Sequence, residues 1–504
     1  PNGVIVTDLA VSMPEVVDKT KYVIKIRDGV RFHDNERARK YPGLAGRQLT
    51  GEDVKYMIER QVNEASPKSG RYYRKSQWQT VEKIEVGPDP LTVTITTKRP
   101  TAPFIHFLAD NNALIVAKEL VDEATDLMIT HGDNTDPMVG TGPFYLDQYI
   151  TAQVVKLRRN PDWFAKDDLA DQGLPDRPIV DGYDALWPVQ DDTATEAAFK
   201  SKQVDGTGYV DSRNVYRIAG ETGAEVDRAV TSGFINSRFL IADSDRAKSP
   251  WKDVMLRKAI SLAVDRVRLG QQMFGEGFYV LNPPVGQAIT QWALPYDQFI
   301  TKPGYRYTRA EREEDITEAR RLWEAAGGSG AVGSVDAVVS GIPDYIPRVW
   351  PQFQKMLSDH LGFEIKGHVD PSGYTELDLC LLQKSCVFGL GFDNGWNDLD
   401  DWVYPYYHTG GPKNSFNVSD PKLDAMLDAS RAEFEYEKRR QLGYDIQNYL
   451  LDEAYLMLMW CSPSQPGTEW PYRRNRRPTP WFGNAFHVAN QWLDKTHPSF
   501  QGRA

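Results

Sequence analysis

Four aspartates follow one another closely in an aromatic stretch of the chain. The segment GFDNGWNDLDDWVYPYYHTGG, residues 391–411, places Asp393, Asp398, Asp400 and Asp401 among tryptophan and tyrosine side chains. Carboxylates avoid apolar surroundings unless a partner compensates their charge. No lysine or arginine lies between Cys386 and Pro412, so a cationic partner must come from elsewhere in the fold or from a ligand. The segment could hold a metal ion, a catalytic proton or a cationic group of a ligand.

Motifs for catalysis and for metal binding are missing from the sequence. It contains no GxSxG, HExxH, Walker A or EF-hand pattern, and no two of its 8 histidines are spaced by three or four residues. The glycine run GLGFDNG departs from a dinucleotide-binding fingerprint, because its third glycine is one residue late. Oxygen ligands would suit calcium, but Trp396 and Trp402 are poor neighbours for a hydrated ion. We therefore expect no catalytic residue, no metal and no cofactor, with ordinary solvated loop acids as the remaining alternative.

The composition is that of a soluble globular protein. The chain has 504 residues, of which 41% are hydrophobic and 26% charged. A net charge of -11 disfavours a nucleic-acid partner, which would need a basic face. No apolar run is long enough to span a membrane and no signal peptide is present. The chain starts at Pro1 without a methionine, so we expect a processed or incomplete N-terminus.

Strand and helix patterns alternate along the chain, which predicts an α/β or α+β fold. Residues 22–26 alternate like a half-buried strand, and Thr50 is placed to cap a helix that follows it. Apolar residues at helical spacing predict one helix over 254–267. The run GGSGAVGS, residues 327–334, is expected to be a surface loop.

The three cysteines are Cys380, Cys386 and Cys461. They show no CxxC and no spacing typical of zinc ligands. Cys380 and Cys386 could pair, because they are expected at a helix end and on the following strand. Alternatively, all three could be structural thiols.

Six segments, in order, resemble one family, the large extracytoplasmic solute-binding proteins of ABC transporters in the dipeptide, oligopeptide and nickel group. Singly each match is weak, but together they cover most of the chain. The matching segments are IRDGVRFHD (26–34), LTGEDVKYMIER (49–60), VGTGPFYLDQY (139–149), VKLRRNPDWF (155–164), MLRKAISLAVDR (255–266) and NVSDPKLDAMLDAS (417–430). The sequence departs from the family at its start, where only 25 residues precede the first match.

The resemblance implies an α/β, two-lobe periplasmic-binding-protein-like fold of type II, cluster C. The first lobe would carry an extra subdomain, residues 1–139. Residues 140–231 and 464–504 would complete this hinge-connected lobe, and residues 232–463 would form the second lobe. A solute would bind between the lobes.

The family also gives the acidic segment an expected role. A stretch similar to G-W-x-x-D-x-x-D-P follows a strand of the second lobe in these proteins and lines the cleft, where an acid pairs with the ligand's ammonium group. Aligning its last aspartate with Asp401 assigns that role to Asp398, supported by Asp401 or Asp400. A slip of one residue would make the partner Asn397 instead.

Two further expectations concern the walls and the far end of the cleft. Trp396 or Trp402 would form an aromatic wall beside the ammonium group. Arg348 lies in a region that loosely matches the part of the second lobe from which peptide binders present an arginine to the ligand's carboxylate. A solvated residue at a helix start is the alternative for Arg348.

The function implied is capture of a peptide-like or other amine-bearing solute and its delivery to the permease of an ABC importer. The resemblance further implies a monomer in the periplasm or another extracytoplasmic compartment, attached to the membrane only through an N-terminal lipid anchor outside this chain. An oligosaccharide-binding protein of the same fold is one alternative, since 13 tryptophans would suit sugar stacking. A secreted metal-dependent hydrolase is an alternative from another class.

Overall fold

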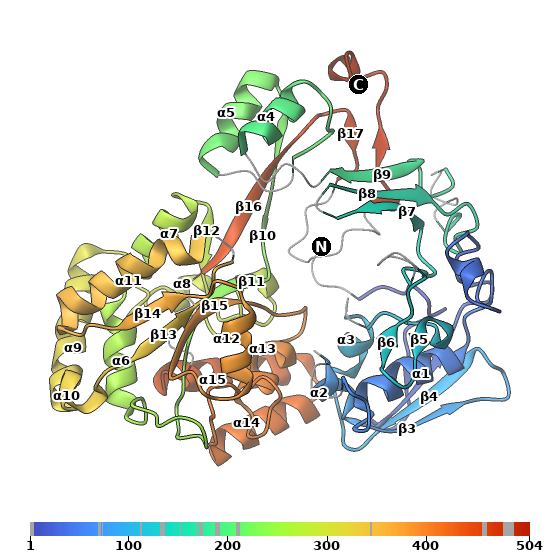
Figure 1. The fold of residues 1–504 in the computed structure, drawn as a ribbon. Coiled ribbons are helices and arrows are strands. Elements are labelled where there is room, and N and C mark those ends of the chain that lie inside the picture. The colour runs from blue at the N-terminus through green and yellow to red at the C-terminus, as the bar shows by residue number, and fades with distance from the viewer. Residues whose placement is uncertain are drawn as a thin grey trace. The chain divides into compact units, whose positions relative to one another are not determined.

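The computed structural model gives an α/β protein whose chain divides into two compact units. Unit 1 comprises Pro1–Asp227 and Pro466–Ala504, and unit 2 comprises Arg228–Gln465 (Figure 1). The predicted boundaries at 139, 231 and 463 remain a prediction. The structure describes residues 5–503 apart from 69–71, 73, 111–112, 132–136, 152, 169, 171–174, 187–191, 208–211, 343–344, 456–460 and 477–487.

The first half of unit 1 is built on an antiparallel sheet with strand order β1-β2-β4-β3. Its alternating residues explain it, because Tyr22 and Ile24 on β2 point into a core that also receives Val93 and Ile95 from β4. The predicted strand at 22–26 is thus confirmed as β2. The strands are β1 (Glu15–Val16), β2 (Lys21–Lys25), β3 (Val81–Val86) and β4 (Thr92–Thr97).

Helix α1 (Gly51–Val62) packs on this sheet and starts where the sequence predicts. The Thr50 backbone N–H donates to Asp53 over 2.9 Å, which completes a capping box. Gly51 is required here, because a Cβ at this position would lie 2.6 Å from Val93. The shorter elements that follow are α2 (Lys75–Trp78), α3 (Phe104–Leu108), β5 (Val121–Asp122) and β6 (Leu127–Met128).

The rest of unit 1 combines a three-stranded sheet, two helices and the C-terminal segment. The sheet has the order β7-β8-β9 and is antiparallel throughout. Trp470 and Tyr472 pack with Phe199 and Ile218 in a separate small core. The elements are β7 (Phe144–Ile150), β8 (Val154–Arg159), β9 (Gly182–Leu186), α4 (Asp192–Lys200), α5 (Ser212–Thr222), β17 (Arg473–Arg474) and β18 (Trp492–Leu493).

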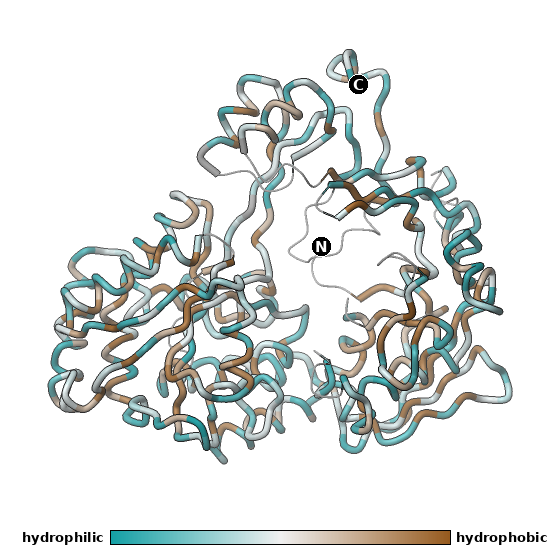
Figure 2. Tube along the Cα trace, viewed as in Figure 1, coloured by the Kyte–Doolittle hydropathy of each residue, from teal (hydrophilic) through white to brown (hydrophobic). Residues whose placement is uncertain are grey.

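Unit 2 is organised around a mixed sheet with strand order β11-β15-β13-β14. Strands β13 (Asp336–Val339), β14 (Lys366–Val369) and β15 (Phe388–Asn394) run parallel to one another, and β11 (Gly233–Phe239) pairs antiparallel with β15. Figure 2 shows hydrophobic residues along β13 and β15, the two inner strands of the sheet. On one face Phe239 and Phe388 pack edge-on against each other and Phe239 against Trp251.

Helices cover both faces of this sheet. Helix α11 (Tyr345–Leu361) connects β13 to β14, and α12 (Thr375–Leu382) connects β14 to β15. Gly389 and Gly391 allow α12 to approach β15, because a Cβ on either would lie within 3 Å of Leu377. The other helices are α6 (Val254–Ala263), α7 (Arg266–Phe274), α8 (Tyr296–Phe299), α9 (Arg309–Ala325), α10 (Gly328–Val332), α13 (Leu399–Tyr407), α14 (Pro421–Ala432) and α15 (Tyr436–Asp452).

Two sequence expectations for unit 2 were wrong. The single helix over 254–267 is divided into α6 and α7, because Val264 is extended and the Asp265 carboxylate accepts from the Arg268 N–H, which caps a new helix. The expected loop at 327–334 contains α10, which starts after Gly327 adopts a left-handed φ of 86°. Both differences concern single helices and do not involve the strands of the sheet.

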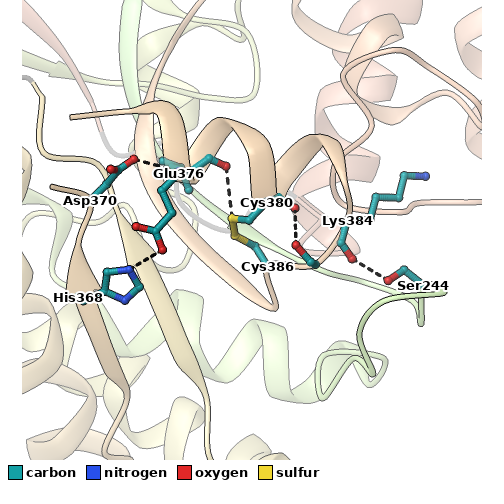
Figure 3. Close-up of a disulfide and its surroundings, with 9 residues drawn as sticks. Ser244, His368, Asp370, Glu376, Cys380, Lys384 and Cys386 are labelled. Carbon is teal, nitrogen blue, oxygen red and sulfur yellow. Dashed lines mark hydrogen bonds and ion pairs between the residues drawn. A yellow bond between two sulfur atoms is a disulfide. The ribbon is translucent and has the colours of Figure 1, made fainter. Parts of the chain in front are cut away.

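A disulfide joins Cys380 and Cys386 and ties α12 to the start of β15. Figure 3 shows Cys380 on the helix and Cys386 on the chain that leaves it, with the His368–Glu376 and Ser244–Lys384 hydrogen bonds on either side. Cys461 is a buried free thiol. Of the two alternatives for the cysteines, the structure therefore supports the pair.

A second sheet of unit 2 continues into unit 1. Its order is β10-β16-β12, formed by β10 (Glu225–Val230), β12 (Tyr279–Leu281) and β16 (Cys461–Glu469). The boundary between the units falls within β10, after Asp227, and within β16, after Gln465. The chain therefore passes between its units along two neighbouring strands.

Candidate functional site

The carboxyl ends of the parallel strands of unit 2 form the candidate site. In α/β sheets ligands bind beyond these ends, where loops present polar and apolar groups together. Three apolar groups lie here: Ile342 after β13 is 57% exposed, Val369 at the end of β14 is 40% exposed, and Trp396 after β15 is half-buried. Of the four aspartates of the sequence segment, Asp393 lies near the end of β15 and the other three follow the strand at the same edge.

Asp398 caps α13 and is paired with an arginine from the fold. Its carboxylate accepts from the Asp400 N–H over 2.8 Å, and Arg439 of α15 donates to both of its oxygens over 2.7 and 2.5 Å. Asp398 is only 2% exposed. Burial lowers the pKa of Arg439, but the charge of Asp398, its hydrogen bond and the charge of Asp400 together outweigh burial, so the net pKa is raised. The cation that the sequence requires is therefore present in the chain itself.

Asp400 has an equivalent partner on the neighbouring helix. Arg431 of α14 donates to its two oxygens over 2.8 and 2.7 Å, and the guanidinium lies 3.2 Å from the centre of the Tyr404 ring. Asp400 is 4% exposed. These two bidentate pairs fix the first turn of α13 to α14 and α15.

Asp401 and Trp402 hold the backbone of Trp396 from both sides. The Asp401 carboxylate accepts from the Trp396 N–H over 2.8 Å, and the Trp402 indole N–H donates to the Trp396 carbonyl over 2.7 Å. Trp402 is 2% exposed and stacks on Phe234 with ring centres 5.1 Å apart. Gly395 makes room for it, because a Cβ there would overlap the Trp402 ring. The Trp396 indole is thus presented on a fixed loop.

Arg348 lies in the first turn of α11, directly after β13. It is exposed, whereas Ile346, Val349 and Trp350 of the same helix are buried. Arg348 thus starts from the same sheet edge as the aspartates and is directed away from the helix core. Its contact with a ligand stays a prediction, as does that of Asp398, Asp400, Asp401, Trp396 and Trp402.

A further ion pair completes the site and was missed in the sequence. Arg238 of β11 donates to Asp393 at the end of β15 over 2.6 Å, and their side chains are 10% and 14% exposed. Tyr374 also interacts with Arg238. On α13, the Tyr406 hydroxyl accepts a hydrogen bond from Lys413 over 3.2 Å. No local pattern points to Arg238, because it lies in a strand far along the chain from the acidic segment.

Arg439 could have been found from the sequence. It lies seven residues before Ile446 and four before Gly443, both buried, so it shares the inward face of α15. A charged residue on an apolar stripe needs a partner of opposite charge. The acids after β15 were the available candidates.

Two hollows lie away from this edge. One in unit 1 measures about 1240 Å³ and another, between α7, α9 and α11, about 110 Å³. The larger one is lined by both basic and acidic side chains, such as Arg37 and Lys166 with Glu36 and Asp162. We therefore place the candidate site at the sheet edge.

The described residues offer little for other kinds of site. Within them, no group of three histidines, cysteines or acids is arranged to hold a metal ion. Nor does any helix among them combine the length and the apolarity needed to cross a membrane.

A family model covers most of the chain. The model described as bacterial extracellular solute-binding proteins, family 5 Middle, matches residues 4–415. The dipeptide-binding protein of Pseudomonas aeruginosa is 23% identical over 496 residues, which is 94% of this chain and 84% of that protein.

Solved structures share the fold. The chain superimposes on the periplasmic binding protein DppA of Helicobacter pylori in complex with the peptide STSA with a TM-score of 0.73 and 17% identity, covering 97% of this chain and 89% of that one. It superimposes on AgaA of A. tumefaciens R10 in complex with agropinic acid with a TM-score of 0.73 and 20% identity, covering 97% and 90%. The two-lobe type II binding-protein fold expected from the sequence is confirmed.

Proposed function

Because the chain belongs to the bacterial extracellular solute-binding proteins of family 5, we propose that it captures a peptide-like or other amine-bearing small solute and delivers it to an ABC importer. The family match over residues 4–415 carries this proposal. The names of the relatives support the ligand class, because they include a dipeptide-binding protein and a complex with a tetrapeptide.

The residues of the candidate site would have different roles in binding the solute. Trp396, held at its N–H and its carbonyl, supplies the wall against which the solute packs. Asp398 and Asp400 fix the loop through their pairs with Arg439 and Arg431, and Asp401 holds the Trp396 N–H. The Asp401 carboxylate adds negative charge behind Trp396, which favours a cationic group on the solute. Ile342 and Val369 add apolar contact at the same edge, and Arg348 is the group proposed for a carboxylate of the solute.

The remaining parts of the proposal concern the cell. The protein acts outside the cytoplasm as a monomer attached to the membrane through a lipid anchor, and its macromolecular partner is the permease of the importer. We propose no catalytic activity, since the residues at the sheet edge are engaged in ion pairs and caps.

Replacing Trp396 tests the proposed site. We expect calorimetric titration of the wild-type chain with the dipeptide Ala-Phe to show one binding site, and Trp396→Ala to weaken the affinity about tenfold or more, as for an aromatic anchor. Trp492→Ala is the matched control, because Trp492 is also a tryptophan with solvent-accessible surface, at 39%, but lies on β18 of unit 1. Equal affinities for all three proteins would contradict the site.

A further inference from the structure

A cluster of charges lies where β10 and β16 enter unit 1. Glu469 is the last residue of β16, and its side chain is 12% exposed. Arg473 donates to its carboxylate over 3.0 Å, and Arg476 lies 3.8 Å from the same oxygen. Arg476 also binds Asp227 of β10 over 2.5 Å and Glu225 over 2.7 Å. Arg473 and Arg476 thus form ion pairs with three carboxylates on neighbouring strands.

The surroundings leave Glu469 little freedom. Gly206 forms an isolated bridge with Glu469, and a Cβ at position 206 would overlap its carboxylate. Of the other charged groups here, Asp205 is occupied by Arg503 and the Tyr472 hydroxyl. Arg473 also donates to Gln491 and lies over the Tyr183 ring. The carboxylate therefore cannot turn toward solvent without moving the chain at residue 206.

This packing affects the charge of Glu469. Burial raises its pKa to about 7, Arg473 and Arg476 oppose that shift, and Asp227 adds to it. Burial also raises the pKa of Asp227, while Arg476 and Arg473 lower it and Glu225 raises it. The charge of Glu469 therefore changes near neutral pH.

We propose that Glu469 makes the β10–β16 connection a proton-sensitive joint, tightened when its carboxyl is protonated and loosened when it is charged. The charged form must keep its charge in a largely buried position, where Arg473 and Arg476 attract it and Asp227 repels it. The protonated form keeps a hydrogen bond from Arg473 without the cost of burying that charge. Because these strands carry the chain between the units, their pairing affects any movement of one unit against the other. The joint itself does not depend on the proposed function. Only an effect of the joint on solute capture would depend on it.

The direction of the pH dependence follows from the raised pKa. A carboxyl whose pKa is higher in the folded joint than in the open one stabilises the joint at low pH, and that contribution is lost as the pH rises through about 7. The pairing of β10 with β16 should therefore weaken between pH 6 and pH 8.

Hydrogen exchange of the ligand-free chain tests the joint without any solute. After correction for the intrinsic rates, we expect the amides of β10 and β16 to open several-fold more often at pH 8 than at pH 6, at most about tenfold. Glu469→Gln, which keeps the shape and cannot ionise, should abolish this difference. Glu225→Gln is the matched control, because Glu225 binds the same arginine but its side chain is 55% exposed, and it should behave as the wild type.

Two results would overturn the joint. One is equal protection of β10 and β16 at both pH values in the wild type. The other is an unchanged pH dependence in Glu469→Gln. Neither result bears on whether the protein binds a peptide, so the joint and the proposed function fail independently.

Discussion

Asp398 and Arg439 show how a charge can be kept inside unit 2. Each carries its full charge in a nearly dry environment, and the two parallel hydrogen bonds between them offset the loss of hydration. Removing one partner leaves the other charged and buried. The attraction between the two charges adds little net stability, because it is offset by their lost hydration. Losing either partner would destabilise the protein strongly, because the other charge would stay buried without its counter-charge.

We predict that Asp398→Asn lowers the free energy of unfolding by about 3–5 kcal/mol, because Arg439 loses its counter-charge. Urea unfolding followed by circular dichroism measures this loss. Asp359→Asn is the control, because Asp359 pairs with Lys355 on an exposed face of α11, and its replacement should leave the free energy of unfolding nearly unchanged.

A different outcome would favour the sequence prediction for Asp398. If Asp398→Asn kept its stability and lost affinity for Ala-Phe, the carboxylate would be serving the solute's ammonium group rather than Arg439. That pattern would contradict the role inferred from the ion pair.

At the residue scale, the sequence established the need for partners but not their identity. The absence of lysine and arginine between Cys386 and Pro412 correctly required a cation from another part of the chain or from a ligand. Arg439 could have been inferred from its place on the apolar stripe of α15. Arg238 could not, because only the pairing of β11 with β15 brings its strand next to the strand of Asp393. Tertiary contacts of this kind leave no local pattern.

At the scale of elements, α12 depends on two features of β15. Gly389 and Gly391 let the helix approach the strand, and the Cys380–Cys386 bond fixes the turn between them. Tyr374, just before α12, reaches the Phe392 carbonyl over 3.2 Å near the end of β15. The position of α12 is therefore linked to the edge that carries the candidate site.

We predict that the double variant Cys380→Ala, Cys386→Ala unfolds at lower urea concentration, with a loss of about 2 kcal/mol, since the bond closes a short loop. Reduction of the wild type should cause a similar loss and leave the variant unaffected. Titration of denatured, unreduced protein should find one thiol, from Cys461. Three thiols would exclude the disulfide.

The elements themselves were largely predictable where the pattern was periodic. The capping box at Thr50 and the strands β2 and β15 followed from local chemistry. The split between α6 and α7 did not, because the apolar stripe continues through Val264 although the backbone there is extended. The helix at 328–332 was hidden by its glycines, whose intrinsic preference is overridden by packing.

At the scale of the molecule, six short segments were enough to identify the fold, although they do not specify how the chain packs. These segments determined the family, and the family supplied the two-lobe architecture. The ion pairs that Arg473 and Arg476 make with carboxylates of β10 and β16 were not indicated by any of the six segments.

Native mass spectrometry of the chain with an equimolar pool of dipeptides, tripeptides and maltotriose tests the central claim most directly. We predict a one-to-one complex with one or more peptides, retained in competition with the sugar and lost when the peptide amino group is acetylated. A complex with maltotriose alone, or equal binding of acetylated and free peptides, would contradict capture of an amine-bearing solute.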